Sequence, residues 1–161
     1  MVAKSYRELL VWQKSIQLTL MVYQLSKAFP REEIYGLTSQ MRRCAVSIPS
    51  NIAEGAGRLN TPEFRQFLGI ARGSSFELQT QLTIAKELGF GDNGQIVAAE
   101  QLCNEVGKMI FGAVAGLESR VKAWVVNVNL RIADWLGSNR SAFHTHTPHS
   151  HSPKEPLWQT Q

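Results

Sequence analysis

The chain has 161 residues, 43% of them hydrophobic, and a formal net charge of +4. It contains no run that approaches the roughly 20 apolar residues of a membrane span, and no basic N-terminus that leads into an apolar stretch. We therefore expect a cytoplasmic protein that consists of one domain and a tail. Its mildly basic charge favours polyanionic partners.

The first predicted helix runs from Leu9 to about Phe29, where Pro30 disfavours a further helical residue. Apolar residues recur there at spacings of three and four, which is the period of a helix. They form two adjacent stripes, one of Val11, Leu18, Val22, Leu25 and Phe29 and one of Trp12, Ile16 and Tyr23. So broad an apolar surface predicts burial on more than one side, and hence self-association.

A second helix is predicted within Gly36–Gly57. Its apolar stripe points away from Arg42 and Arg43 and consists of Leu37, Met41, Cys44, Ile48 and Ile52. Pro49 lies inside this pattern, which predicts a kink, with a break into two helices as the alternative. Gly55 and Gly57 are expected to end the helix and form the turn.

Two further helices follow. The third is expected to begin with Thr61 as N-cap and Pro62 in the first helical position, and to end near Leu88. Its stripe is Phe64, Phe67, Leu68, Ala71, Ser75, Leu78, Leu82 and Ala85. After a glycine-rich turn, the fourth begins near Gln95, with a stripe of Leu102, Val106, Met109, Ala113 and Leu117.

Four such helices with short connections predict an all-α protein, an antiparallel up-down-up-down four-helix bundle over residues 1–121 with a kinked second helix. Residues 122–137 form an extension that satisfies the period of a helix and also that of a strand; the helix is favoured because it needs no partner strand. Residues 138–161 are rich in Ser, Thr, His and Pro, which predicts a disordered tail.

Few residues are suited to catalysis. All four histidines lie between residues 144 and 151, in the tail, so the bundle has no imidazole for general-base chemistry. Cys44 and Cys103 lie inside apolar stripes, which predicts buried free thiols rather than a disulfide or zinc site. We expect no enzymatic activity, no catalytic residue, no cofactor and no metal.

The arginines are the candidate functional residues. Between Gly36 and Phe76 there are two acidic residues and five basic ones, namely Arg42, Arg43, Arg58, Arg65 and Arg72. Arginine suits phosphate because its planar fork donates two parallel hydrogen bonds. No base-reading motif, aromatic stacking platform or zinc finger accompanies the cluster in the sequence. Nucleic-acid binding should therefore be directed at the backbone, although solvation of the bundle surface explains any single arginine equally well.

Three segments carry a resemblance to a known family. YRELLVWQKSIQL at residues 6–18, YGLTSQMRRCAVSIPSNIAEGAGR at 35–58 and EFRQFLGIARGSSFELQTQLTIAKELGF at 63–90 closely resemble the bacterial four-helix-bundle proteins of the 23S rRNA intervening-sequence protein family. The resemblance covers about residues 5–120. By position, Arg42, Arg43 and Arg58 match the family pattern, and the stretch after Val121 departs from it.

The resemblance implies a homopentamer of four-helix bundles that is often encoded within intervening sequences of 23S rRNA genes. The family is also similar to the accessory variability protein of diversity-generating retroelements, a basic pentamer that binds nucleic acid and a reverse transcriptase. No catalytic residues are assigned in the family, so the resemblance implies none here. The leading interpretation is an oligomer that binds nucleic acid, RNA rather than DNA; the alternative is a protein-interaction scaffold, such as an accessory subunit of a reverse transcriptase or another enzyme.

Overall fold

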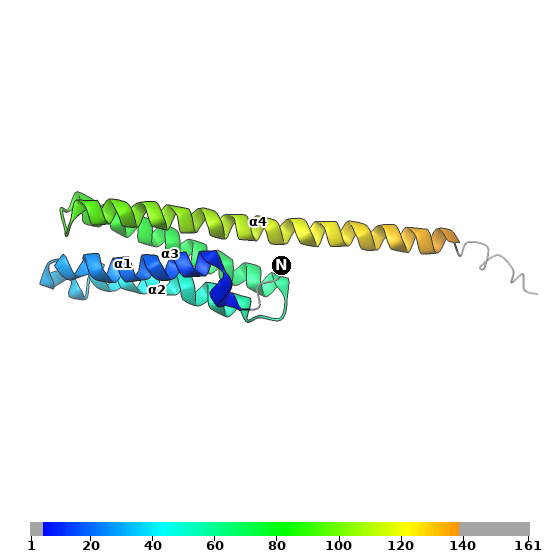
Figure 1. Cartoon of the computed structure of the whole chain (residues 1–161), viewed down its shortest axis with the longest axis horizontal. Coiled ribbons are helices and arrows are strands. Elements are labelled where there is room, and N and C mark those ends of the chain that lie inside the picture. The colour runs from blue at the N-terminus through cyan, green and yellow to red at the C-terminus, as the bar shows by residue number, and fades with distance from the viewer. Residues whose placement is uncertain (1–4, 139–161) are drawn as a thin grey trace, which may run out of the picture. The chain divides into compact units, whose positions relative to one another are not determined.

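The protein is all-helical over residues 5–138, the part of the chain that the computed structural model describes (Figure 1). The described residues contain no strand, and their four long helices confirm the predicted bundle with a C-terminal extension. These helices are α1 (Leu10–Leu25), α2 (Leu37–Ala56), α3 (Thr61–Glu87) and α4 (Asn93–Ser138). Short 3-10 helices precede and follow α1, at Tyr6–Glu8 (η1), Ser26–Ala28 (η2) and Arg31–Ile34 (η3).

Contacts between neighbouring helices fix their order around the bundle. The α2 helix packs between α1 and α3: the Thr19 hydroxyl of α1 donates to the Ala45 carbonyl of α2 at 2.7 Å. The α4 helix likewise contacts both α3 and α1, the latter through Lys14 and Glu105 at 2.9 Å. The order is therefore α1, α2, α3, α4 around a central core, which places the α1–α2 seam opposite the α3–α4 seam.

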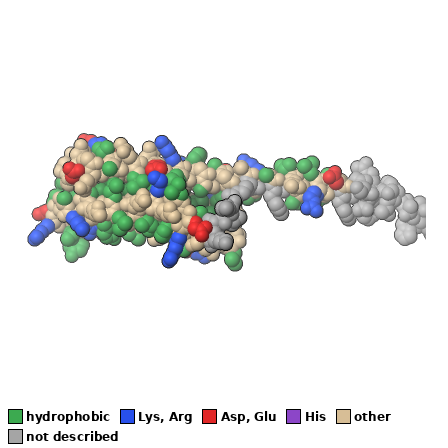
Figure 2. All heavy atoms as spheres, viewed as in Figure 1, with side chains coloured by type: hydrophobic (Ala, Val, Ile, Leu, Met, Phe, Trp, Pro, Cys, Tyr) green, Lys and Arg blue, Asp and Glu red, His purple; other side chains and the backbone are tan. Residues whose placement is uncertain are grey.

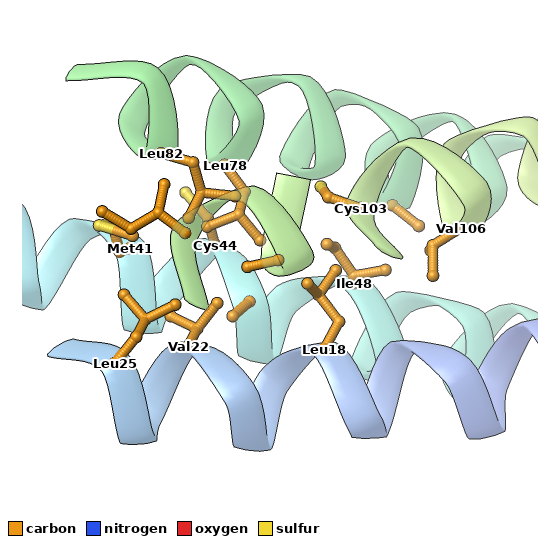
Figure 3. Close-up of a cluster of buried hydrophobic side chains, with 14 of the residues drawn as sticks. Leu18, Val22, Leu25, Met41, Cys44, Ile48, Leu78, Leu82, Cys103 and Val106 are labelled. Atoms are coloured by element: carbon orange, nitrogen blue, oxygen red, sulfur yellow. The ribbon is translucent and has the colours of Figure 1, made fainter. Parts of the chain in front are cut away.

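The core is formed by one apolar stripe from each helix (Figure 3). The stripes of the first three helices lie largely where the sequence predicts them. The α4 stripe agrees only in part: its fully buried apolar residues are Ile96, Ala99, Cys103, Val106 and Ile110, whereas Leu102, Ala113 and Leu117 of the predicted stripe are partly buried against the core. Apolar residues occupy two neighbouring faces of α4, and their period alone does not decide which face turns inward.

Helix boundaries differ from the predictions by a few residues. The α1 helix ends at Leu25 and continues as a 3-10 turn, and Phe29 is already extended before Pro30. The N-cap of α3 is Asn60 rather than Thr61, since the Asn60 side chain accepts a hydrogen bond from the backbone N–H of Glu63 at 2.9 Å. An amide oxygen at this position satisfies one of the donors that a helix start leaves unpaired.

The second helix contains its proline without a break, because α2 runs as one helix from Leu37 to Ala56. Gly55 lies inside this helix and is buried, since a Cβ there would come within 2.7 Å of the Phe67 Cβ. Gly57 caps the helix at a φ of −82°, so the expected glycine stop does not use the left-handed conformation. That conformation occurs instead in the α3–α4 turn, where Gly89 and Gly91 both have a φ of +69°.

The chain divides into two compact units, Met1–Arg120 and Val121–Gln161, and the four-helix bundle belongs to the first. In the second, α4 continues to Ser138, so the helical alternative is the one observed. Several apolar side chains of this segment are exposed, among them Val126 and Leu130. None of the helices formed by residues 5–138 combines the length and hydropathy that a membrane span requires. The predicted disordered tail falls outside the described residues, apart from Ser138.

Candidate nucleic-acid interface

The five predicted arginines lie at three places on the bundle. Arg42 and Arg43 are on α2, Arg58 follows the end of α2, and Arg65 and Arg72 are on α3. From Arg43 to Arg58 is 15 residues of almost continuous helix, or about 22 Å at 1.5 Å per residue. Figure 2 likewise shows basic side chains lying apart from one another, between hydrophobic patches. Each place therefore has to be considered by its own geometry.

Arg42 lies in a surface pocket of about 440 Å³. The pocket is formed by α1, η3 and α2 and is lined by Tyr23, Ile34, Thr38, Ser39, Arg42, Arg43 and Val46, none of them acidic. The Arg42 guanidinium lies 5.0 Å from the Tyr23 ring centroid, and its Nε donates to the Ser26 hydroxyl at 2.9 Å. Within residues 5–138 no carboxylate pairs with it, so the two terminal nitrogens of a positioned fork remain for a ligand.

Arg43 lies at the rim of the same pocket and is held less firmly than Arg42. Its side chain is 71% exposed, donates to the Gln40 side chain at 2.8 Å and lies 3.8 Å from Glu77 of α3. An exposed ion pair at that distance contributes little to stability, because water screens it. The guanidinium can therefore exchange Glu77 for a phosphate at small cost.

Arg58 and Arg65 differ, because each is held by a carboxylate. Arg58 pairs with Glu54 one turn earlier, and Arg65 pairs with Glu118 of α4 at 2.6 Å. The charge of both arginines is therefore locally cancelled, and the Arg65 pair bridges α3 and α4.

Arg72 extends from α3 toward α4 without a carboxylate partner among the described residues. Its guanidinium lies 5.0 Å from the ring centroid of Phe76 on α3 and 5.2 Å from that of Phe111 on α4. The three side chains line a groove of about 270 Å³ on the α3–α4 seam. Arg65 and Arg72 thus share the edge of α3 that faces α4, as their spacing suggests, but only Arg72 is unpaired.

The unpaired arginines consequently occupy opposite sides of the bundle. Arg42 is on the α1–α2 seam and Arg72 on the α3–α4 seam, whereas the sequence suggests one continuous basic tract. A single subunit offers two separate cationic sites rather than one broad patch.

Aromatic rings lie beside three of the arginines, although the sequence contains no aromatic stacking motif. Arg42, Arg58 and Arg72 all lie over rings, with Phe67 under Arg58 at 4.7 Å. The spacing of four residues between Arg72 and Phe76 is a signal that the sequence contains, since such pairs meet on a helix. The Phe111 ring comes from another helix, and only the fold brings it to the same groove.

The thiols offer no nucleophile at neutral pH. Both cysteines are free and buried, as predicted. Burial raises the pKa of Cys44 to about 11, helped by its contact with Glu77, and burial also raises the pKa of Cys103. In the described part of the chain no three His, Cys, Asp or Glu side chains are grouped as they would be around a metal ion.

Comparison with known proteins identifies the family. The family model described as 23S rRNA-intervening sequence protein matches residues 7–112, about two thirds of the chain. A crystal structure from Bacteroides thetaiotaomicron, described as a protein of unknown function from the S23 ribosomal protein family, matches with a TM-score of 0.61. It is 21% identical, and the match covers 65% of this chain and 98% of that one, which supports the fold. No curated protein matches. The chain belongs to the 23S rRNA-intervening sequence protein family.

Proposed function

We propose that the protein is a non-enzymatic oligomer that binds RNA, with rRNA as its natural target, by contacting backbone phosphates through arginines. The family description links the chain to 23S rRNA genes. The excess of basic residues suits a polyanion, and the sites on the bundle surface present guanidinium groups rather than catalytic pairs.

The observation that carries this proposal is the pocket around Arg42. Its guanidinium is already oriented by Tyr23 and Ser26, so binding a phosphate costs little side-chain entropy. Arg43 adds a second fork at the rim, and Thr38 and Ser39 place hydroxyl groups in the lining. A phosphate contacted from two forks gains charge-assisted hydrogen bonds, which are about twice as strong as neutral ones.

Oligomerisation would multiply these sites. The α1 helix leaves Leu10 56% and Leu20 59% exposed, which is apolar surface outside the Arg42 pocket for a second subunit to cover. The family resemblance favours a homopentamer. A ring of five subunits would present five copies of each arginine site to one RNA, and binding at one site would raise the effective concentration at the next.

The test is the salt dependence of affinity for a 23S rRNA fragment, measured for the full chain and for the double variant Arg42→Ala/Arg43→Ala. Each phosphate contact contributes about 0.7 to 0.9 to the slope of log K against log salt. We therefore expect the double variant to lose affinity and to reduce the slope by about 1.4 to 1.8 per subunit engaged. The matched control is Lys122→Ala/Arg131→Ala, which removes the same charge from the Val121–Gln161 unit and should leave the slope unchanged.

Equal losses in both double variants would show a nonspecific effect of net charge and refute the Arg42 site. An RNA affinity that does not change with salt concentration would refute contact with the phosphate backbone.

The second candidate is a protein-interaction scaffold, such as an accessory subunit of a reverse transcriptase or other enzyme. Its support is the exposure of large apolar side chains at loops of the bundle, Tyr35 at 93% and Leu59 at 102%. A stoichiometric protein partner that copurifies after nuclease treatment, and is lost with Tyr35→Ser/Leu59→Ser, would favour it. Retention of that partner by the variant would count against this surface.

A further inference from the structure

The groove on the α3–α4 seam combines features that the arginine pocket lacks. Its two aromatic rings, Phe76 and Phe111, are 49% and 57% exposed, although burying such rings is favourable. Arg72 lies over both of them, and Gln79 of α3 and Asn104, Gly107 and Lys108 of α4 complete the lining. We refer to these seven residues as the stacking groove.

The floor of the stacking groove is set by close contact between the helices. Gly107 of α4 faces α3, and a Cβ at this position would lie 3.3 Å from the Ser75 hydroxyl. Below it, Ser75 donates to the Cys103 carbonyl at 3.4 Å, which joins α3 to α4 in the buried layer. The two helices therefore approach closely beneath the rings, and the absence of a side chain at Gly107 keeps the floor of the groove open.

The charges of the groove are unbalanced. Arg72 and Lys108 both line it, and within residues 5–138 neither forms an ion pair. The nearest carboxylates along α4 are engaged elsewhere, Glu105 with Lys14 and Glu118 with Arg65. The Asn104 side chain also has no hydrogen-bond partner among the described residues, so its amide is free to donate and accept.

An unpaired nucleotide matches this set of groups. A base has a flat face that stacks on an aromatic ring or a guanidinium, an edge that an amide can hydrogen-bond, and a phosphate that an ammonium can neutralise. A base inside a duplex has both faces covered by its neighbours and cannot enter. A purely apolar side chain of another protein would bury Phe76 and Phe111 but leave two cations without a counter-charge, which is unfavourable.

We propose that the stacking groove binds a single unpaired nucleotide of the RNA, with its base on Phe76 and Phe111 beside Arg72 and its phosphate at Lys108. This inference rests on the proposed RNA binding and adds a selectivity to it. The Arg42 site holds backbone of any RNA, whereas the stacking groove distinguishes single-stranded segments, such as loops or strand ends, from paired ones.

The test compares two RNAs of equal length, one unstructured and one a hairpin with a closed stem, against three forms of the full chain. Phe76→Leu/Phe111→Leu keeps apolar volume but removes the rings, and Phe76→Tyr/Phe111→Tyr restores them. Stacking of one base on an aromatic side chain corresponds to about a 5- to 150-fold effect on affinity. We expect the leucine form to lose this much for the unstructured RNA and less than twofold for the hairpin, and the tyrosine form to bind as the original does.

A 2-aminopurine base in the unstructured RNA provides a second readout, because its fluorescence is quenched when it stacks. Quenching should occur with the original and tyrosine forms and be lost with the leucine form.

Each other outcome overturns the proposal in a recognisable way. If the leucine form binds both RNAs normally while Arg42→Ala/Arg43→Ala still weakens them, the stacking groove is wrong and the proposed function stands. If the leucine form instead changes the mass measured by light scattering and leaves RNA affinity intact, the groove is an interface between subunits. If no form binds either RNA, both proposals fail.

Discussion

Replacing Gly55 with alanine tests the packing that holds α2 against α3, and with it the position of every arginine on those helices. A Cβ at Gly55 would lie 2.7 Å from the Phe67 Cβ and 2.9 Å from the edge of the Phe64 ring. The Phe64 ring can rotate, but the Phe67 Cβ is fixed to the backbone, so the helices must separate slightly. Overpacking of this kind costs about 1–3 kcal/mol.

Alanine also favours the helix over glycine by about 0.8–1 kcal/mol, which offsets part of that cost. We therefore expect Gly55→Ala to lower the free energy of unfolding by about 1 kcal/mol and the melting temperature by about 2–4 °C. Gly69→Ala is the matched control, because Gly69 is exposed inside α3 and a Cβ there meets nothing within 4 Å. It should stabilise the protein by about 0.5–1 kcal/mol through helix propensity alone.

The measurement is thermal and denaturant unfolding of both variants beside the original chain. The two substitutions are chemically identical, so the sign of their difference isolates the contact with Phe64 and Phe67. If Gly55→Ala proved as stable as Gly69→Ala, the close approach of α2 and α3 at this point would be wrong.

Two further predictions concern stability and assembly. Because burial raises the pKa of Cys44 to about 11, while an unfolded thiol has a pKa of about 8.5, the thiol contributes stability that is complete below about pH 8.5 and is lost as pH rises toward 11. Denaturant unfolding between pH 7 and 10.5 should show this fall, and Cys44→Ala should flatten it; an unchanged pH profile would contradict it. Truncation after Arg120 should leave the melting temperature within about 2 °C of the original, since the buried hydrophobic residues of the described chain end at Ile110. Light scattering should show several subunits for both lengths, and a monomeric short form would refute self-association through α1.

The sequence predicts the buried residues well in helices that have a single apolar stripe. In α2, Met41, Cys44, Ile48 and Ile52 all lie fully or almost fully buried, as their spacing indicates. Where a helix has apolar residues on two faces, the helical period of those residues does not identify which face is buried. In α4 the fully buried face is centred on Cys103 and Ile110, whereas Leu102 of the predicted stripe is only partly buried against the core.

The sequence predicts which residues belong to the candidate site, but it does not predict how they are arranged in space. Five arginines in one segment are visible in the sequence, but whether each is free depends on partners from other helices. Glu118 lies 53 positions after Arg65 and still pairs with it, whereas Arg72 meets Phe111 instead of a carboxylate. Such pairings follow from the register of α3 against α4, which no local pattern specifies.

The most direct test of RNA binding as the protein's role is crosslinking in its host, followed by sequencing of the attached RNA. The full chain should recover 23S rRNA or its intervening sequence well above background, with crosslinks concentrated in unpaired segments. Arg42→Ala/Arg43→Ala, expressed at the same level, should lose most of that RNA. Recovery at background level, or equal recovery with the variant, would contradict binding through the Arg42 pocket.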